Sequence, residues 1–238
     1  MVYETTDHGQ WTTDRTDNSA PVSISLAEIS RLLRPFELAL DDRQLEVTAR
    51  YLDLLMRWNR ALNLTAVRRP EEVVTRHFGE SLYLTKFAKL DGRLLDVGSG
   101  AGFPGLAIKI LRPDTAAVTL LEPVAKKRAF LKEVVRECQF QRVEVVGARI
   151  EDFSLNHSRE FESVTLRAVG SFGSVLPAAH RCLTATGQLY AWLTGTEALQ
   201  LRRDVPEFSG LFSWSEPITL PMSRDREIWV GSAWRCST

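Results

Sequence analysis

Apolar residues follow a helical period through the N-terminal part of the chain. From Ile24 onward they recur every three or four positions, which predicts an amphipathic helix. A second helix is expected to begin after Asp41, where Gln44 completes a capping-box pattern, and a third is expected to open at Pro70. The pattern therefore predicts an N-terminal helical segment over residues 21–90.

Near residue 92 the pattern changes to short apolar runs that alternate with amphipathic stretches. The runs expected as strands are 94–95, which leads into Asp96, then 118–121, 143–146, 161–166 and 188–193, with a closing hairpin from 211–218 and 227–230. The stretches expected as helices are 106–111, 126–138, 175–183 and 197–205. Such alternation is typical of a parallel sheet with helices on both faces. Residues 91–238 therefore predict an α/β domain with a Rossmann-like, mostly parallel seven-stranded sheet.

Between the first predicted strand and its helix lies a loop rich in glycine. Residues 94–105 read Leu-Leu-Asp-Val-Gly-Ser-Gly-Ala-Gly-Phe-Pro-Gly. Gly100, Gly102 and Gly105 match the fingerprint of dinucleotide-binding proteins. The frame Asp96-x-Gly98-x-Gly100-x-Gly102 is similar to the glycine loop of S-adenosylmethionine-dependent methyltransferases, and it fits better because it places the acid at the strand end. We therefore favour S-adenosylmethionine over NAD as the cofactor.

Polar or unusual residues also follow the next three predicted strands. In open α/β sheets ligands bind beyond the carboxyl ends of the strands. Glu122 follows the second strand, where a carboxylate can accept both hydroxyls of a ribose. Ile150 and Glu151 follow the third strand, where an adenine would lie, and Arg167 follows the fourth, where a guanidinium can bind a carboxylate or a phosphate. Each residue alone also has a purely structural interpretation, but four strand ends agree.

Composition narrows the class of protein. The 238 residues carry 30 Lys and Arg against 30 Asp and Glu, so any contact with RNA has to come from local patches. Three widely spaced cysteines favour a reducing cytoplasm over disulfides or zinc, and the four histidines lack metal-binding spacing. No stretch is apolar enough for a membrane span. The polar residues 1–20 predict a disordered tail.

Two local clusters of basic residues offset the neutral total. The first cluster comprises Arg57, Arg60, Arg68 and Arg69, and the second comprises Lys126, Lys127, Arg128, Lys132 and Arg136. Either cluster can contact phosphates, and either can equally be a solvated helix face. His77, beside an apolar helix face, is interpreted as a core histidine rather than a catalytic one.

Six motifs in order resemble the RsmG (GidB) methyltransferases of bacterial small-subunit ribosomal RNA. They are Trp58-Asn59-x-x-x-Asn63-Leu64-Thr65, Arg76-His77 with Ser81-Leu82, the loop 95–105 with its Gly-Phe-Pro-Gly extension, Lys126-Lys127 with Phe130-Leu131, Arg149-x-Glu151-Asp152-Phe153, and Arg167-Ala168. The resemblance covers residues 45–232. Departures are Glu80 and Glu122, where the family usually has Asp, and Thr194, where it often has Lys.

The resemblance implies methyl transfer from S-adenosylmethionine to guanine N7 of 16S ribosomal RNA, and together with the loop and the basic clusters it leads to expected roles for residues. The expected cofactor-binding residues are Asp96, Gly98, Gly100, Gly102, Phe103, Glu122, Ile150, Glu151 and Arg167. Arg167 is also the expected catalytic residue, and Lys127, Arg136 and Arg149 are the expected RNA-binding residues. The expected partner is small-subunit ribosomal RNA or the assembled subunit. A cytoplasmic monomer with no metal is expected.

Three other functions share parts of these patterns. A small-molecule methyltransferase would have the same cofactor site but would need no basic face. An NAD(P)-dependent oxidoreductase would share Glu122 and part of the glycine frame. A non-catalytic RNA-binding paralogue would keep the basic patches, and Thr194 leaves that interpretation open.

Overall fold

The N-terminal segment is helical, as predicted. The computed structural model describes residues 24–114 and 116–233, so the predicted tail 1–20 lies outside the described residues. The helices are α1 (Leu26–Leu33) with a 3-10 turn (Arg34–Phe36), α2 (Asp42–Leu62), α3 (Pro70–Val73), a π-helical turn (Val74–Gly79), α4 (Glu80–Tyr83) and a 3-10 turn (Leu84–Lys86). From α3 to the last 3-10 turn these pieces follow one another directly along the chain.

The predicted capping box at the start of α2 is confirmed. The Asp41 side chain accepts a hydrogen bond from the backbone N–H of Gln44 at 2.8 Å, and the Gln44 side chain accepts one from the backbone N–H of Asp41 at 3.0 Å. Two N–H groups that the helix itself leaves unpaired are satisfied in this way. The helix ends at Asn63, which has a left-handed conformation with φ of 48°.

The second part of the chain forms one twisted sheet. Its strands are β1 (Arg93–Val97), β2 (Ala117–Leu121), β3 (Val143–Val146), β4 (Phe161–Arg167), β5 (Leu183–Thr194), β6 (Phe212–Trp214), β7 (Ile218–Thr219) and β8 (Arg226–Ala233). Their order is β3-β2-β1-β4-β5-β8-β6, with β7 also paired to β8. The first five strands are parallel, and β8 is antiparallel to β5.

The strand count differs from the predicted seven for a simple reason. Strand β6 pairs with residues 231–233 of β8, and β7 pairs with residues 227–228 of the same strand. Because β5 occupies the other edge of β8, the two short strands together fill one outer position. The Rossmann-like, mostly parallel sheet is therefore confirmed, with its seventh position divided between two short strands.

The register of the sheet brings four loops together. Val97 at the end of β1 pairs with Leu121 of β2 and with Leu166 of β4, and Leu121 pairs with Val146 of β3. The carboxyl ends of these parallel strands therefore lie at one edge. The glycine loop and the residues that follow β2, β3 and β4 meet there.

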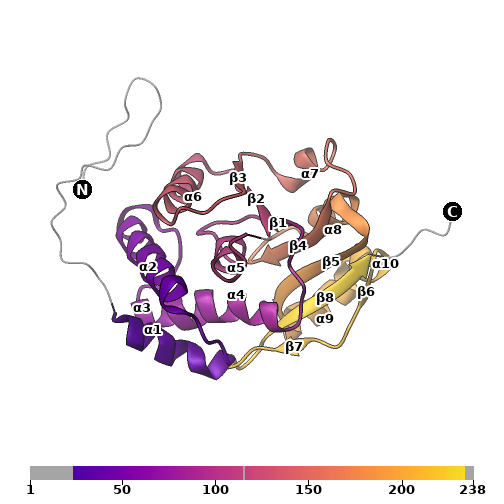
Figure 1. The fold of residues 1–238 in the computed structure, drawn as a ribbon. Coiled ribbons are helices and arrows are strands. Elements are labelled where there is room, and N and C mark those ends of the chain that lie inside the picture. The colour runs from indigo at the N-terminus through magenta and orange to yellow at the C-terminus, as the bar shows by residue number, and fades with distance from the viewer. Residues whose placement is uncertain (1–23, 115, 234–238) are drawn as a thin grey trace, which may run out of the picture.

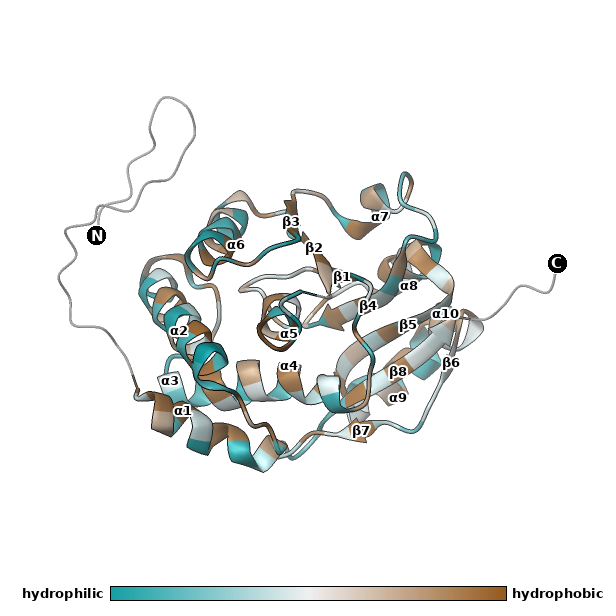
Figure 2. Cartoon of the chain, in the orientation of Figure 1, coloured by the Kyte–Doolittle hydropathy of each residue, from teal (hydrophilic) through white to brown (hydrophobic). Residues whose placement is uncertain are grey.

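Helices cover both faces of the sheet (Figure 1). On one face pack α5 (Gly105–Leu111), α6 (Ala125–Glu137) and the N-terminal helices, and on the other α7 (Ile150–Phe153), α8 (Phe172–Cys182), α9 (Gly195–Asp204) and α10 (Pro206–Gly210). Neighbouring strand residues point to opposite faces, so Leu94 joins the first core and Leu95 the second. Figure 2 shows the resulting pattern, with largely hydrophobic strands between helices that turn polar positions outward.

A buried carboxylate joins the N-terminal helical segment to the sheet. Glu80 of α4 is 2% exposed and forms ion pairs with Arg167 of β4 and with Arg226 of β8. Its backbone carbonyl accepts a hydrogen bond from the indole N–H of Trp192 in β5 at 3.2 Å. We call Glu80, Arg167 and Arg226 the Glu80 clamp. The clamp fixes the helical segment against β4 and β8, and the hydrogen bond from Trp192 adds a contact with β5.

Replacing the carboxylate of the Glu80 clamp is expected to destabilise the fold. Glu80→Gln leaves Arg167 and Arg226, which are only 13% and 28% exposed, without a negative partner. The expected loss of unfolding free energy is about 3 kcal/mol. Urea denaturation followed by circular dichroism measures it.

The matched control for this change is Glu37→Gln. Glu37 also pairs with a cation, Lys86, but its side chain is 76% exposed. Because exposed pairs contribute little, its unfolding free energy should change by less than about 0.5 kcal/mol. Equal stability of the two variants would contradict a structural role for the clamp.

Candidate functional site

The glycine loop after β1 adopts a conformation that suits glycine. Gly98, Gly100 and Gly102 have φ angles of 67°, 55° and 89°. L-amino acids with side chains rarely adopt this left-handed region. At Gly102 a Cβ atom would also collide with the hydroxyl of Tyr51 and would lie 2.8 Å from Leu106 Cδ1. At Gly100 it would meet only the carbonyl oxygen of Gly98, at 3.7 Å, so this position faces open space.

Asp96 lies beneath the loop rather than in a cavity. It is 1% exposed, its Oδ1 accepts a hydrogen bond from Thr165 Oγ1 at 2.8 Å, and its Oδ2 accepts one from the backbone N–H of Gly105 at 3.2 Å. Burial raises the pKa of Asp96 to about 6, against the opposing effect of these hydrogen bonds. Both oxygens therefore hold the loop, and contact with a cofactor stays a prediction for this residue.

Glu122 supports the loop from the neighbouring strand end. It is 3% exposed, and its carboxylate accepts hydrogen bonds of 2.9 Å from the backbone N–H groups of Gly100 and Val124. The sequence predicted a ribose-binding carboxylate at this position. The residue does lie beside the loop, but its hydrogen bond to Gly100 could not be foreseen, and ribose binding stays a prediction.

Two cavities open at the carboxyl edge of the sheet, one on each side of Gly98. The first, which we call the loop cavity, has a volume of about 280 Å³. Its lining residues are Leu64, Thr65, Ala66, His77, Gly98, Ser99, Gly100, Ala101, Phe103, Lys127, Arg167 and Ala168. The second, which we call the strand-end cavity, has a volume of about 240 Å³. Gly98 lines both, so the two form one divided site.

The strand-end cavity contains the residues predicted for an adenine. Ile150 and Glu151, at the start of α7, line it together with Arg149, Leu121 and others. Ile150 is 3% exposed and gives the cavity an apolar wall. Glu151 accepts a hydrogen bond from the hydroxyl of Ser174 at 2.7 Å, which orients its carboxylate. An apolar wall beside an oriented carboxylate suits a flat base that carries an amino group.

Aromatic rings form one wall of the loop cavity. The ring of Phe103 stacks between Tyr51, at a centroid distance of 5.2 Å, and His77, at 5.0 Å. His77 Nε2 lies 2.8 Å from Thr65 Oγ1, while its Nδ1 is buried without a partner. Burial, followed by nearby Arg167, lowers the pKa of His77 to about 3. His77 is packed as the sequence predicted for a core histidine, but it also lines the cavity, which the sequence did not reveal.

Arg167 lies at the end of β4 and lines the loop cavity, but its terminal nitrogens are already engaged. Nη1 donates to Ser81 Oγ at 2.9 Å and to the carbonyl of His77, and Nη2 donates to Glu80 at 2.8 Å and to the carbonyl of Arg76. Burial lowers the pKa of Arg167 to about 10, although Glu80 opposes that effect. The predicted catalytic residue is thus also the residue that anchors the helical segment.

The three predicted RNA-binding residues are not brought together. Lys127, in the first turn of α6, lines the loop cavity, and the exposed Arg149 lines the strand-end cavity. Arg136 lies near the other end of α6 and forms ion pairs with Glu133 and Glu137. The structure therefore gives these residues three different surroundings, and RNA binding stays a prediction for each.

The N-terminal basic cluster is also partly neutralised. Arg57 pairs with Asp53 at 3.0 Å, and Arg68 donates to the carbonyl of Asn59 and to the side chain of Asn63. Arg69 lies within 4 Å of Glu71 and Glu72. Most of this cluster thus contacts its own helical segment.

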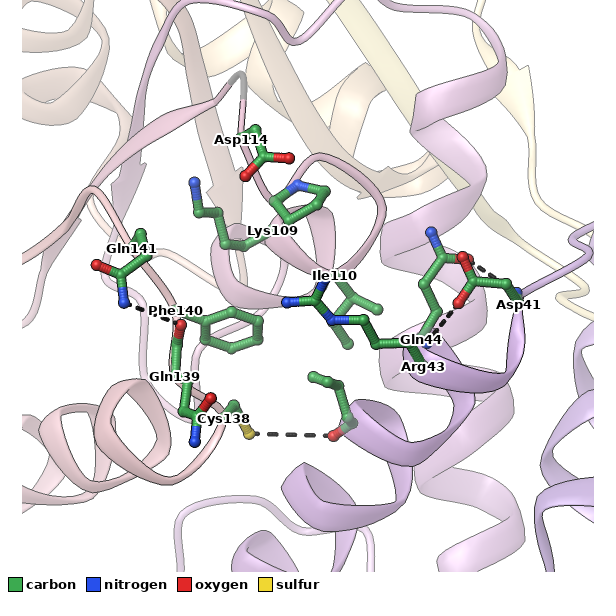
Figure 3. Close-up of a pocket in the computed structure, with 12 residues that line it drawn as sticks. Asp41, Arg43, Gln44, Lys109, Ile110, Asp114, Cys138, Gln139, Phe140 and Gln141 are labelled. Atoms are coloured by element: carbon green, nitrogen blue, oxygen red, sulfur yellow. Dashed lines mark hydrogen bonds between the residues drawn. The ribbon is translucent and has the colours of Figure 1, made fainter.

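A third cavity lies elsewhere, between the start of α2, the end of α5 and the turn after α6 (Figure 3). Its volume is about 140 Å³, and none of the predicted site residues lines it. Among its lining residues, Lys109 is fully buried and donates from Nζ to the carbonyl of Ala116. Because the glycine loop and the four strand ends lie at the divided site and not here, the divided site is the candidate functional site.

Solved structures share this fold. A SAM-dependent methyltransferase from Aquifex aeolicus has a TM-score of 0.57 at 12% identity, covering 68% of this chain and 93% of that one. TYW2 from Pyrococcus horikoshii, in complex with MeSAdo, has a TM-score of 0.51 at 16% identity, covering 66% and 61% of the two chains. The sheet order, the glycine loop and these likenesses define a methyltransferase fold of the Rossmann-like type.

Sequence relatives specify the family. The pattern of the family described as rRNA small subunit methyltransferase G (GidB) matches residues 44–209. Ribosomal RNA small subunit methyltransferase G from Roseiflexus castenholzii is 36% identical over 200 residues, which cover 82% of this chain and 85% of the relative. Its namesake from Halorhodospira halophila is 39% identical over 175 residues, covering 74% and 81%. The chain belongs to this family and is an S-adenosylmethionine-dependent methyltransferase, which confirms the resemblance seen in its motifs.

Two features are absent from residues 24–114 and 116–233. Within them no group of His, Cys, Asp or Glu residues is arranged to hold a metal ion. Within the same ranges no helix is both long and apolar enough to cross a membrane.

Substitution of Gly100 is expected to abolish cofactor binding without unfolding the protein. Gly100→Asn places a side chain in the open space of the loop cavity, and Asn tolerates the left-handed conformation better than other residues. Calorimetry with S-adenosylhomocysteine should detect no binding, while the thermal unfolding midpoint falls only slightly.

Gly102→Asn is the comparison variant for Gly100. Its Cβ would collide with Tyr51 and Leu106, so the thermal unfolding midpoint of this variant should fall much further than that of Gly100→Asn. Normal affinity of Gly100→Asn for S-adenosylhomocysteine would show that the cofactor does not approach this face of the loop.

Proposed function

We propose that this protein transfers a methyl group from S-adenosylmethionine to guanine N7 in the 16S ribosomal RNA of the small ribosomal subunit. The names of its relatives support the substrate class, because both are called ribosomal RNA small subunit methyltransferase G. The observation that carries the choice of atom is the chemistry of the loop cavity. Among the described residues that line this cavity there is no carboxylate, and the pKa of His77, the histidine among them, is about 3.

Guanine N7 is an acceptor that suits such a cavity. Its lone pair is free, so no proton has to leave before the methyl group is attacked. S-adenosylmethionine supplies an electrophilic methyl group and leaves as a neutral thioether. A catalytic base is therefore unnecessary, and the chain has only to align the reactants, which contributes up to about 7–11 kcal/mol in favourable cases.

The divided site supports a specific placement of the cofactor. The adenine lies in the strand-end cavity against Ile150, with its amino group toward Glu151. The ribose is held at Glu122, and the amino-acid part lies in the loop cavity above Gly98 and Gly100. The remaining predicted positions act around it: Asp96 and Gly102 shape the loop, Phe103 forms the wall, and Arg167 holds the rim of the cavity.

The RNA reaches this site from the side of the helical segment. Arg149 is an exposed cation that lines the strand-end cavity, which supports a contact between this residue and an RNA phosphate. The partner is the small-subunit RNA or the assembled subunit, and the protein acts as a cytoplasmic monomer. Arg136, which forms ion pairs with Glu133 and Glu137, contributes less to RNA affinity than Arg149.

The direct test is methyl transfer to small subunits that lack the modification. With tritiated S-adenosylmethionine, wild-type protein should label the RNA, and nucleoside analysis should recover the label as N7-methylguanine. Boiled protein and subunits that already carry the modification serve as controls. Label in another base, in protein or in a small molecule would contradict the proposal.

The pH profile of the reaction should be flat on the alkaline side of neutrality. The pKa values of Asp96 and His77, about 6 and about 3, lie below pH 7, so from pH 7 to pH 9 Asp96 stays ionised and His77 stays neutral. Single-turnover rates at saturating cofactor should therefore vary less than about twofold over that range. A log-linear rise with pH would indicate a catalytic base and would contradict methyl transfer to N7 without one.

A further inference from the structure

Two cations line the loop cavity, and they differ in what they already bind. A guanidinium has five N–H donors, and Arg167 uses those on its two terminal nitrogens for Glu80, for the Ser81 hydroxyl and for two carbonyls. Only its Nε–H has no partner among the described residues. Releasing Arg167 toward a ligand would leave Glu80, which is 2% exposed, with Arg226 alone. Arg167 is therefore held by its contacts in the Glu80 clamp and is not available to a ligand.

Lys127 is in the opposite situation. It is half-buried in the first turn of α6 and lines the same cavity as Gly98, Ser99 and Gly100. Its ammonium makes no hydrogen bond or ion pair with any of the described residues. A lysine carries three donors on a flexible stem, so it can follow an anionic group that enters the cavity. Lys127 is thus the lining cation that remains available.

The position of the cavity indicates which anion this is. Gly98 separates the loop cavity from the strand-end cavity, whose apolar wall and carboxylate suit the adenine. The amino-acid part of the cofactor must then lie on the other side of Gly98, together with its carboxylate. The guanine that enters the same cavity is uncharged, and its phosphate is separated from the base by the sugar. The anion closest to the glycine loop is the carboxylate of the cofactor.

We propose that Lys127 binds the carboxylate of the amino-acid part of S-adenosylmethionine. The assignment rests on the proposed placement of the cofactor across Gly98. It replaces two expectations from the sequence, in which Arg167 meets the carboxylate and Lys127 grips RNA. Arg167 instead acts indirectly, because it holds the helical wall of the loop cavity in place.

A comparison of two ligands tests this assignment without any methyl transfer. S-adenosylhomocysteine carries the carboxylate, and 5′-methylthioadenosine has the same adenosine and sulfur but lacks the amino acid. For Lys127→Gln, calorimetry should show S-adenosylhomocysteine affinity weakened at least tenfold, which corresponds to about 1.4 kcal/mol. The affinity for 5′-methylthioadenosine should be unchanged, and this also shows that the variant is folded. Lys127→Arg should restore most of the lost affinity because it keeps the charge.

The matched control is Lys126→Gln, which removes the same charge from the exposed neighbouring residue of α6. It should leave the affinities for both ligands unchanged. RNA affinity and its salt dependence, measured for the same variants, distinguish the two roles of Lys127. A normal S-adenosylhomocysteine affinity in Lys127→Gln, or equal losses for both ligands, would overturn the assignment. A loss confined to RNA affinity would restore the phosphate role.

Failure of this inference and failure of the proposed function give different results. If Lys127→Gln weakens only S-adenosylhomocysteine while the wild type methylates no guanine N7, the carboxylate assignment stands and the proposed reaction falls. If the wild type forms N7-methylguanine and Lys127→Gln binds both ligands normally, the reaction stands and the assignment falls.

Discussion

The buried carboxylate of Asp96 determines the shape of the site. One oxygen holds Thr165 of β4, the other holds the first N–H of α5 at Gly105, and the backbone carbonyl of Asp96 accepts the hydroxyl of Ser99 at 2.9 Å. These contacts connect two strands and a helix through one residue that is 1% exposed. They offset the cost of burial, which still raises its pKa to about 6. The glycine loop lies over Asp96, and its residue Gly98 lines both cavities of the divided site.

The sequence predicted the position of the candidate site because the end of each strand can be recognised where an apolar run stops. In parallel strands the carboxyl ends meet at one edge, so residues that follow four separate apolar runs had to come together there. The register of β1 with β2 and β4 confirms that alignment. The direction in which each side chain points could not be predicted from the apolar pattern. Glu122 turns to the amide of Gly100, and Asp96 turns beneath the loop.

Partners distant in the sequence explain most of what could not be predicted. Arg136 with Glu133, and Arg57 with Asp53, are pairs three and four residues apart, so the helical period alone could have indicated them. Arg167 and Glu80 are 87 residues apart, and only the folded chain brings them together. Without Glu80, Arg167 looks like a free guanidinium at a strand end. With Glu80, it is a structural anchor that also lines a cavity.

The N-terminal helical segment is part of the site as well as a cover for the sheet. Tyr51 of α2 donates a hydrogen bond to the carbonyl of Ala101 in the glycine loop, and it stacks on Phe103. Leu64, Thr65, Ala66 and His77 supply the wall of the loop cavity that faces the glycine loop across it. The strand-end cavity, by contrast, is built entirely from the sheet domain. The loop cavity is therefore shared between the helical segment and the glycine loop, so the Glu80 clamp, which holds the helical segment against the sheet, also fixes the shape of this cavity.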